Sequence, residues 1–369
     1  MVNKLLHKLF QKKWTNEDVS SMLGQFQGAY LSYATDDAIR RGGASGGAVT
    51  AILDALLREG SINGAIVCTT HIINNKVRTR FIIARHKEGL LKSQGSKYVE
   101  TSFIKEAIRL INEFDGKVAV VGLPCNITVL RKKITKNAIL ASKVVFTIAL
   151  FCGHNSQKIL IDTLLGRLLY NKTASLEKFR FRIGHWRGRM ICKLTDDQVI
   201  ERSFSEFSLY QNLFFFAERK CLSCFDHFGY SADLNIGDIW SYHFKEKNIK
   251  YSCVITKTER GENLLQRTSA SGALSLYPIK IDDVLDGQSR SAPAHYNVSA
   301  RHRVAKFLGI SIPDRTNCKV KWHEYLVAFI ILINWKWSRH PFFSKLIFRV
   351  PKPILKIYLY FFKGLESLK

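Results

Sequence analysis

The sequence predicts an α/β fold with a mixed, mostly parallel sheet core, an antiparallel β insertion and a helical, basic C-terminal tail. Three observations support this prediction. The first half alternates segments of helical and strand periodicity, which is typical of helices packed on parallel strands. Short alternating segments broken by glycines follow, and the chain ends in a basic, aromatic stretch.

The elements of the first half follow from hydrophobic periodicity. In chain order the pattern predicts a helix over 46–58, strands over 62–70 and 77–85, a helix over 103–114, strands over 117–122 and 141–151, and a helix over 156–170.

The second half changes character. The segment 176–204 is interrupted by Gly184, Gly188 and the Asp196–Asp197 pair, so it predicts antiparallel strands. Further strands are expected over 232–237 and 250–257, with a helix over 261–267. We divide the chain into an N-terminal extension (1–23), an α/β region (24–175), a second region with a CxxC loop (176–300) and a basic aromatic helical tail (301–369).

Composition narrows the class of protein. Hydrophobic residues make up 46% of the 369 residues, which indicates a globular chain rather than a disordered one. The net charge of +26 favours acidic proteins, anionic surfaces or polyanions as partners. Neither a zinc-finger spacing nor an aromatic RNP-type strand accompanies the charge, so we expect no nucleic-acid partner.

The termini bear on localisation. The N-terminus is basic and amphipathic but has no signal-peptide apolar core, and the longest apolar run is only Tyr325 to Trp335. We therefore expect a cytoplasmic protein without a spanning helix. From Lys319 onward the tail has ten lysines and arginines against Glu324 and Glu366, with many aromatics between them. Such a stretch fits peripheral contact with the inner membrane, or a helical appendage with a solvated basic face.

Four cysteines form the strongest chemical pattern. Cys125 and Cys152 each follow a predicted strand, and Cys221 and Cys224 form a CLSC loop. The carboxyl ends of parallel strands meet at one sheet edge, so a CxxC loop nearby could complete a four-thiolate cage for iron–sulfur or zinc. The alternative is that Cys125 and Cys152 are buried hydrophobes and CLSC is a surface loop. Cys68, Cys192, Cys253 and Cys318 are expected to be inert.

Glycine-rich turns form the second pattern. In RRGGASGGAVT, Ser45, Gly46 and Gly47 precede a helix, where free backbone N–H groups can bind phosphate. The segment SQGSKY offers hydroxyls and a lysine for a phosphate or ribityl chain, and Gly122 and Pro124 form a turn before Cys125. Each of these is equally compatible with an ordinary turn.

Five segments also carry a family resemblance. They are ASGGAVTAILDALLREGSINGAIV, GSKYVETSFIKEAI, VAVVGLPCNITVLRK, FRFRIGHW and CLSCFDHFGYSADLNIGDIW. In this order they resemble motifs of the coenzyme F-420 hydrogenase/dehydrogenase beta-subunit family of iron–sulfur flavoproteins. The chain is most similar to the bacterial polysaccharide-locus type, because no cysteine precedes Cys68 and the ligands of an N-terminal ferredoxin domain are therefore missing.

The resemblance implies FAD, one [4Fe–4S] cluster and electron transfer. By motif position it makes Cys125, Cys152, Cys221 and Cys224 the cluster ligands. The flavin contacts that it implies are Ser45, Gly46, Gly47, Ser93, Gly95, Ser96, Lys97, Tyr98, Gly122, Pro124 and Asp238. Leu123 and Asn126 stand where the family has threonine and glutamine.

The predicted function is that of a flavin- and iron–sulfur-dependent oxidoreductase. It would pass electrons between a carrier such as ferredoxin or coenzyme F-420 and an unidentified small-molecule or glycan-linked substrate, with surface-polysaccharide biosynthesis as the candidate setting. No catalytic residue is assigned; the candidates for proton transfer or stacking are His154, His185, Trp186, His227 and His243. The alternatives are a non-catalytic relative that acts as a partner in polysaccharide assembly at the inner membrane, and a zinc-stabilised nucleic-acid-binding protein.

Overall fold

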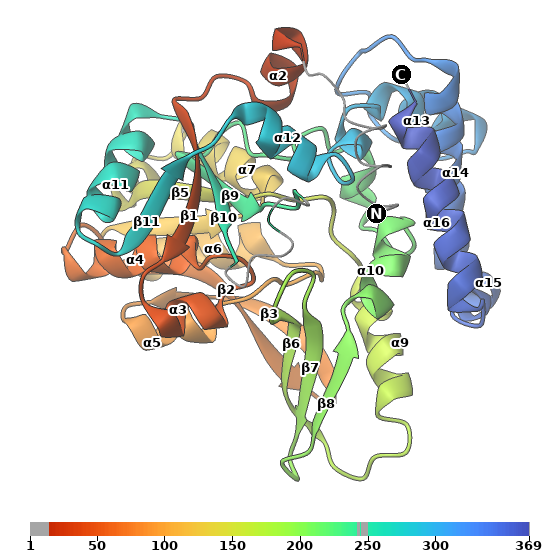
Figure 1. The fold of residues 1–369 in the computed structure, drawn as a ribbon, viewed down its shortest axis with the longest axis horizontal. Coiled ribbons are helices and arrows are strands. Elements are labelled where there is room, and N and C mark those ends of the chain that lie inside the picture. The colour runs from red at the N-terminus through yellow and green to blue at the C-terminus, as the bar shows by residue number, and fades with distance from the viewer. Residues whose placement is uncertain (1–14, 242–243, 245–249, 369) are drawn as a thin grey trace.

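The computed structural model describes residues 15–241, 244 and 250–368. Residues 1–14 of the predicted N-terminal extension lie outside this range. The extension ends in α2 (Asn16–Leu23), which begins where the Thr15 side chain accepts a hydrogen bond from the Asp18 amide. Figure 1 shows this helix at the top of the molecule, with the large sheet to the left and the C-terminal helices to the right.

A large mixed sheet lies at the centre of the fold. The described strands follow the order β11 (Leu274–Pro278), β1 (Gly28–Ala34), β10 (Ser252–Thr256), β9 (Leu234–Asp238), β5 (Val144–Leu150), β4 (Val118–Gly122), β2 (Gly64–Ile73) and β3 (Lys76–Ala84). The four strands β9, β5, β4 and β2 run parallel to one another, and antiparallel strands continue the sheet on both sides. The predicted mixed, mostly parallel core is confirmed. The sheet takes strands from both sides of the boundary we drew at residue 175.

Helices cover both faces of the sheet because its central strands are apolar on both sides. One core joins α4 (Ala48–Arg58), α5 (Lys87–Lys92) and α11 (Glu259–Ala270) to the sheet, with α3 (Asp37–Gly42) nearby. A second core, on the opposite face, joins the sheet to α6 (Phe103–Glu113), α7 (Pro124–Ile134) and α8 (Ala138–Lys143). Strand β4 is buried along its whole length, as expected of a parallel strand covered twice.

The predicted antiparallel insertion is a separate three-stranded sheet. It consists of β6 (Leu176–Ile183), β7 (Arg189–Leu194) and β8 (Val199–Ser203), paired in chain order. It lies below β3 in Figure 1, between the large sheet and α9 (Lys158–Leu168). Helix α10 (Ser205–Asn212) follows it and leads toward the CxxC loop.

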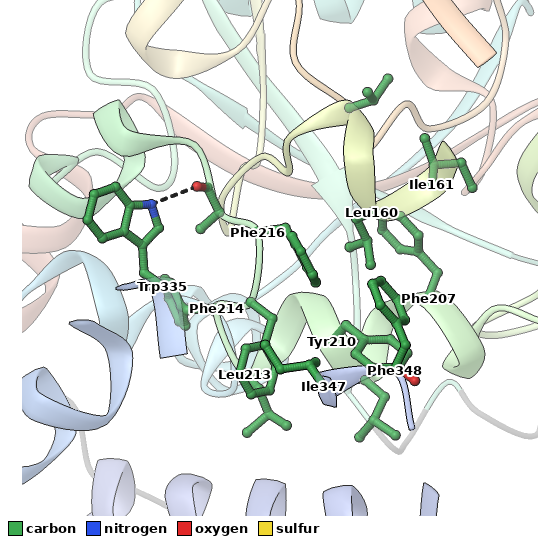
Figure 2. Packing of buried hydrophobic residues seen from close by; sticks show 14 of the residues in the cluster. Leu160, Ile161, Phe207, Tyr210, Leu213, Phe214, Phe216, Trp335, Ile347 and Phe348 are labelled. Atoms are coloured by element: carbon green, nitrogen blue, oxygen red, sulfur yellow. Dashed lines mark hydrogen bonds between the residues drawn. The ribbon is translucent and has the colours of Figure 1, made fainter. Parts of the chain in front are cut away.

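The tail is helical, as predicted, and it packs on the body. It contains α13 (Val298–Phe307), α14 (Trp322–Arg339), α15 (Pro341–Ile347) and α16 (Lys352–Ser367); α12 (Ile281–Gln288) precedes it. Figure 2 shows Phe348 stacked near Phe216, with ring centroids 5.2 Å apart, and the Trp335 indole N–H donating to the Ala217 carbonyl at 3.0 Å. The inner side of the tail is therefore part of a core shared with α9 and α10.

Some element predictions were wrong. Strand β5 begins only at Val144, because Asn137 caps the short helix α8 by accepting a hydrogen bond from the Leu140 amide. Helix α4 begins at Ala48, since Gly47 has a φ of 82° and ends the preceding turn. Strands β1 and β11 were missed altogether.

Within the described ranges, no helix combines the length and the apolar character that crossing a bilayer requires.

Candidate functional site

Two of the four cysteines leave the sheet at the same edge. Strand β4 ends at Gly122, and Pro124 begins α7, so Cys125 lies in the first turn of that helix. Strand β5 ends at Leu150, two residues before Cys152. Because β4 and β5 are parallel neighbours, both thiols emerge beyond adjacent carboxyl ends, as the sequence predicted.

The CLSC loop is held against the same edge. Cys221 lies in the short 3₁₀ helix Arg219–Ser223, and its sulfur accepts a hydrogen bond from the Asn155 amide at 3.4 Å. The Cys152 amide donates to the carbonyl of His227, three residues after Cys224, at 3.0 Å. These contacts join the CLSC loop to the segment after β5, and the pairing of β5 with β4 brings the Cys125 turn to the same edge.

The four thiols influence one another electrostatically. Burial raises the pKa of Cys152 well above its usual value, and the other three cysteines raise it further. Burial also raises the pKa of Cys224 to about 11, with a further contribution from Cys125. In the described part of the chain, no group of three or more histidine, cysteine or acidic side chains is arranged to hold a single metal ion.

Two cations lie near the thiols. Lys220 lowers the pKa of Cys125, although burial dominates and raises it overall. Arg301, on α13, is 1% exposed, and its Nε donates to the Leu222 carbonyl inside the CLSC loop at 2.7 Å. A second nitrogen of its guanidinium donates to the Asn297 side chain at 2.9 Å. Burial lowers the pKa of Arg301 to about 10, so it remains a cation at neutral pH.

Buried histidines surround this region. His154 stacks on Phe214 with a centroid distance of 4.3 Å, and burial lowers its pKa to about 3. His227 contacts the Gln288 side chain at 3.1 Å, and burial lowers its pKa to about 4. Neutral imidazoles packed this way fit a structural role better than proton transfer. Of the other candidates, His185 and Trp186 line a small pocket, and His243 lies outside the described residues.

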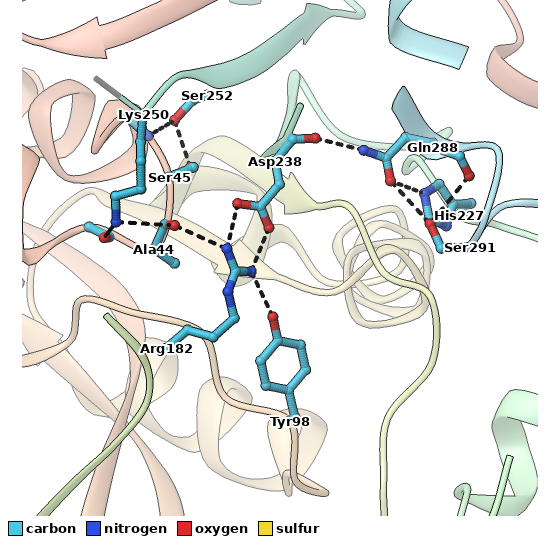
Figure 3. A network of polar contacts seen from close by, with 12 residues as sticks. Ala44, Ser45, Tyr98, Arg182, His227, Asp238, Lys250, Ser252, Gln288 and Ser291 are labelled. Carbon is cyan, nitrogen blue, oxygen red and sulfur yellow. Dashed lines mark hydrogen bonds and ion pairs between the residues drawn. The ribbon is translucent and has the colours of Figure 1, made fainter. Parts of the chain in front are cut away.

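A second polar network joins several predicted flavin contacts (Figure 3). Arg182 on β6 is 2% exposed and makes a two-point ion pair with Asp238, at 2.8 and 3.0 Å. It also donates to the Tyr98 hydroxyl at 2.9 Å and to the Ala44 carbonyl at 3.2 Å. Burial opposes its charge, but Asp238 and Tyr98 more than offset that and raise the pKa of Arg182. The network thus brings Tyr98 and Asp238 to the loop that contains Ser45.

The glycines of that loop are close to other backbone. A Cβ on Gly46 would lie 2.4 Å from the Ser32 carbonyl oxygen, so the close packing on β1 requires glycine there. The Ser45 hydroxyl is 2.8 Å from that of Ser252, and Lys250 donates to the Gly43 carbonyl at 2.7 Å. The polar groups of the turn are thus largely engaged within the protein.

The SQGSKY segment is also engaged with itself. Buried Lys97 donates to the carbonyls of Ser93, Gln94 and Gly95, and burial lowers its pKa to about 8. The Ser93 hydroxyl donates to Gly89 at 3.0 Å. Ser96 follows Gly95, which has a φ of 88°. Gly122 and Pro124 form the β4–α7 turn beside Cys125.

The described residues leave little room at this network. The pocket between Ser45, Asp238 and Trp240 has a volume of about 30 Å³, whereas ligand pockets are typically about 300–1,000 Å³. A larger cavity of about 760 Å³ lies between α4, α5 and the turn before β11, and its lining includes none of the predicted flavin contacts. The residues therefore do not fit a flavin in this conformation.

Sequence reasoning missed three residues of these networks: Arg182, Lys250 and Arg301. Arg182 had a visible signal, because FRFRI alternates arginine with phenylalanine in a strand. Arg301 had none, since it lies in the tail and reaches the CLSC loop only through the packing of α13. Of the cysteines expected to be inert, Cys68, Cys192 and Cys253 lie in strands and Cys318 is exposed.

Comparison with known proteins gives concordant matches. Residues 29–109 match the model for the N-terminal part of the coenzyme F420 hydrogenase/dehydrogenase beta subunit, and residues 115–282 match the model for its C terminus. The coenzyme F420-dependent sulfite reductase of Methanocaldococcus jannaschii is 28% identical over 64% of this chain, and the match spans only 37% of that protein. The coenzyme F420 hydrogenase subunit beta of Methanothermobacter thermautotrophicus is 24% identical over 79% of this chain and 99% of its own length.

A solved structure shares the fold. It is a chain of the F420-reducing [NiFe] hydrogenase complex from Methanosarcina barkeri, with a TM-score of 0.62 and 21% sequence identity, covering 80% of this chain and 97% of that one. The two family models together cover most of the sheet and the CxxC loop. The chain belongs to the coenzyme F420 hydrogenase/dehydrogenase beta-subunit family.

Proposed function

We propose that this protein is an electron-transfer oxidoreductase that binds one [4Fe–4S] cluster through Cys125, Cys152, Cys221 and Cys224, with FAD as a second cofactor. It would pass electrons between a carrier such as ferredoxin or coenzyme F420 and an unidentified substrate, for which surface-polysaccharide biosynthesis is the candidate setting. The single observation that supports this most is that Cys125 and Cys152 follow adjacent parallel strand ends and that the CLSC loop is hydrogen-bonded to the segment after Cys152.

We propose a cluster rather than a single zinc ion because the family resemblance implies one [4Fe–4S] cluster. Four sulfurs around one zinc would all lie about 2.3 Å from it and hence close together. In a [4Fe–4S] cluster each sulfur binds a different iron, so the sulfurs stand farther apart. The effect of Cys125, Cys221 and Cys224 on the pKa of Cys152 supports the closeness of the four thiols that either site would need.

The protein's own residues would support such a cluster in two ways. A bound cluster would accept and release single electrons. Arg301 and Lys220 would offset the negative charge of four thiolates, because both cations act on cysteines of the set. Arg301 would also fix the CLSC loop through its hydrogen bond to Leu222. Packing around His154 and Phe214 would exclude water on the side of the tail.

For FAD, the support is the family resemblance alone. The roughly 30 Å³ pocket beside Ser45 and Asp238 does not accommodate it, so we derive no step through the flavin. The names of the relatives describe proteins that use coenzyme F420, which supports a redox role of this general kind. The net charge of +26 would speed the docking of an acidic protein donor or an anionic substrate.

Cofactor analysis of the anaerobically purified protein tests the proposal. We expect flavin bands in the visible spectrum and about four irons with matching sulfide per chain. One zinc without flavin would support a zinc-stabilised protein instead. A colourless, metal-free protein would support a non-catalytic partner in polysaccharide assembly.

A further inference from the structure

The outer side of the tail helices is unusually apolar for an exposed surface. Twelve of the twenty large apolar side chains that are exposed among the described residues lie between 322 and 368. Figure 1 places α14, α15 and α16 together at one side of the molecule. Single exposed apolar residues are ordinary, but a concentration of this kind marks an interaction site.

Helix α16 has two apolar faces. Leu355 and Phe362 face the core and are 4% and 0% exposed. On the opposite face, Ile354, Ile357 and Phe361 follow i, i+3, i+7 spacing and are 56%, 70% and 59% exposed. An ordinary surface helix would have polar residues at these positions.

Helix α14 and the start of α15 also have exposed apolar side chains. Trp322, Leu326 and Phe329 occur at i, i+4, i+7 on α14 and are 68%, 45% and 43% exposed. Phe342, at the start of α15, is 65% exposed. The apolar surface thus extends over three helices of the tail.

Cations border this surface, and few acids accompany them. Lys345, Arg349 and Lys356 are exposed among or beside the apolar residues. Between 319 and 368 the acids are Glu324 and Glu366; the latter lies in the last turn of α16, where its side chain is buried and paired with Lys363. The exposed charge of the tail is therefore almost entirely positive.

We propose that the outer face of α14–α16 docks on an anionic lipid bilayer and lies in its interface. Apolar side chains would enter the headgroup–acyl boundary, tryptophan and tyrosine would lie at headgroup level, and the cations would pair with anionic lipids. A second copy of the chain fits poorly, because each copy has a net charge of +26 and this surface has one sign. The proposal does not depend on the redox assignment.

Vesicle co-sedimentation of the full chain tests the proposal. We expect binding to phosphatidylcholine vesicles that contain phosphatidylglycerol, weaker binding at high salt, and little binding to phosphatidylcholine alone. The double variant Ile357→Glu/Phe361→Glu should bind at least about tenfold more weakly, because it replaces two apolar side chains that would enter the bilayer with charged ones. The matched control is Ile139→Glu, which alters a residue on α8 that is 58% exposed and should bind like the wild type.

Three results would overturn the proposal. One is a wild-type protein that does not sediment with anionic vesicles. Another is equal binding by the wild type and the double variant. The third is a concentration-dependent dimer in analytical ultracentrifugation that the double variant abolishes, without vesicle binding; the face would then be a self-interface. Circular dichroism of each variant shows whether it is folded.

Discussion

The buried Arg182 on β6 and the partly exposed Asp238 at the end of β9 form a two-point ion pair that joins the small sheet to the large one. The same guanidinium lies 4.7 Å from the centre of the Trp240 ring and bonds to Tyr98. The Arg182 side chain therefore connects β6 to the segments that contain Ala44, Tyr98 and Asp238.

The first prediction concerns this pair. Replacing Arg182 with Met should lower the free energy of unfolding by about 1.5–3 kcal/mol, because it removes the two charged hydrogen bonds of the partly exposed Asp238 carboxylate. Urea unfolding followed by circular dichroism measures this change. Arg41→Met is the control, since its ion pair with Asp37 is exposed and should contribute nothing measurable. Equal stability of the two variants would contradict a structural role for Arg182.

The second prediction concerns pH. Asp233 is buried; burial alone would raise its pKa, but Arg131, Arg260 and Thr147 more than offset this and hold the pKa below its usual 3.8. A depressed carboxyl pKa adds stability above the unfolded value, and that stability is lost as the pH falls through the lower folded value. Below about pH 4, we expect the free energy of unfolding of Asp233→Asn to fall less steeply with decreasing pH than that of the wild type.

Urea titrations from pH 7 to pH 3 measure that limb. The control is Asp115→Asn, at an exposed loop position, which should retain the wild-type slope. An unchanged slope in Asp233→Asn would show that other groups determine the acid sensitivity.

The third prediction concerns the cluster. Cys152→Ser should lose most of its iron, its sulfide and its visible absorption, because one of the four proposed ligands to the proposed cluster is removed. Cys318→Ser should keep all three, since Cys318 is exposed and far along the chain in the tail segment. Anaerobic iron and sulfide assays of both proteins decide the matter. Full cluster content in Cys152→Ser would remove this residue from the ligand set.

The fourth prediction separates two interpretations of the glycine-rich turn. Gly46→Ala should be severely destabilised, because the new Cβ would lie 2.4 Å from the Ser32 carbonyl oxygen and 2.7 Å from the Ser252 amide. Gly166→Ala, inside α9 with nothing within 4 Å of its new Cβ, should be stabilised by up to about 1 kcal/mol. Thermal unfolding without any ligand measures both. A Gly46→Ala protein as stable as the wild type would favour the ligand-cradle interpretation.

Local pattern predicted the central strands well, because β4 and β5 are continuous apolar runs bounded by turns. It did not predict β1 or β11, which pair with each other across more than 200 residues of sequence and join the antiparallel side of the sheet. These short segments mix apolar and polar residues, so they can be recognised as strands only from the strands with which they pair.

The candidate site also has some features that the sequence predicts and others that arise only from tertiary packing. The positions of Cys125 and Cys152 follow from strand ends, which are visible in sequence. The contact between Arg301 and the Leu222 carbonyl arises from docking α13 against the CLSC loop, a tertiary event that periodicity does not encode. The engagement of Gly46 and Lys97 within the protein likewise depends on packing.

The last prediction concerns Arg301. It lies beyond the residues that match the family models, yet its buried cation contacts the loop between Cys221 and Cys224. A positive charge favours the reduced, more negative state of a cluster. Arg301→Met should therefore lower the cluster's reduction potential and weaken iron retention; a tenfold weaker electron affinity corresponds to about 59 mV for a one-electron couple.

Arg301→Lys keeps the charge and should recover most of the potential, but not the hydrogen bond to Leu222. Arg303→Met is the control, because Arg303 lies on the same helix and instead contacts the exposed Tyr325 hydroxyl. Redox titration followed by electron paramagnetic resonance measures the potential independently of turnover. Wild-type potential and iron content in Arg301→Met would leave this residue with a packing role only.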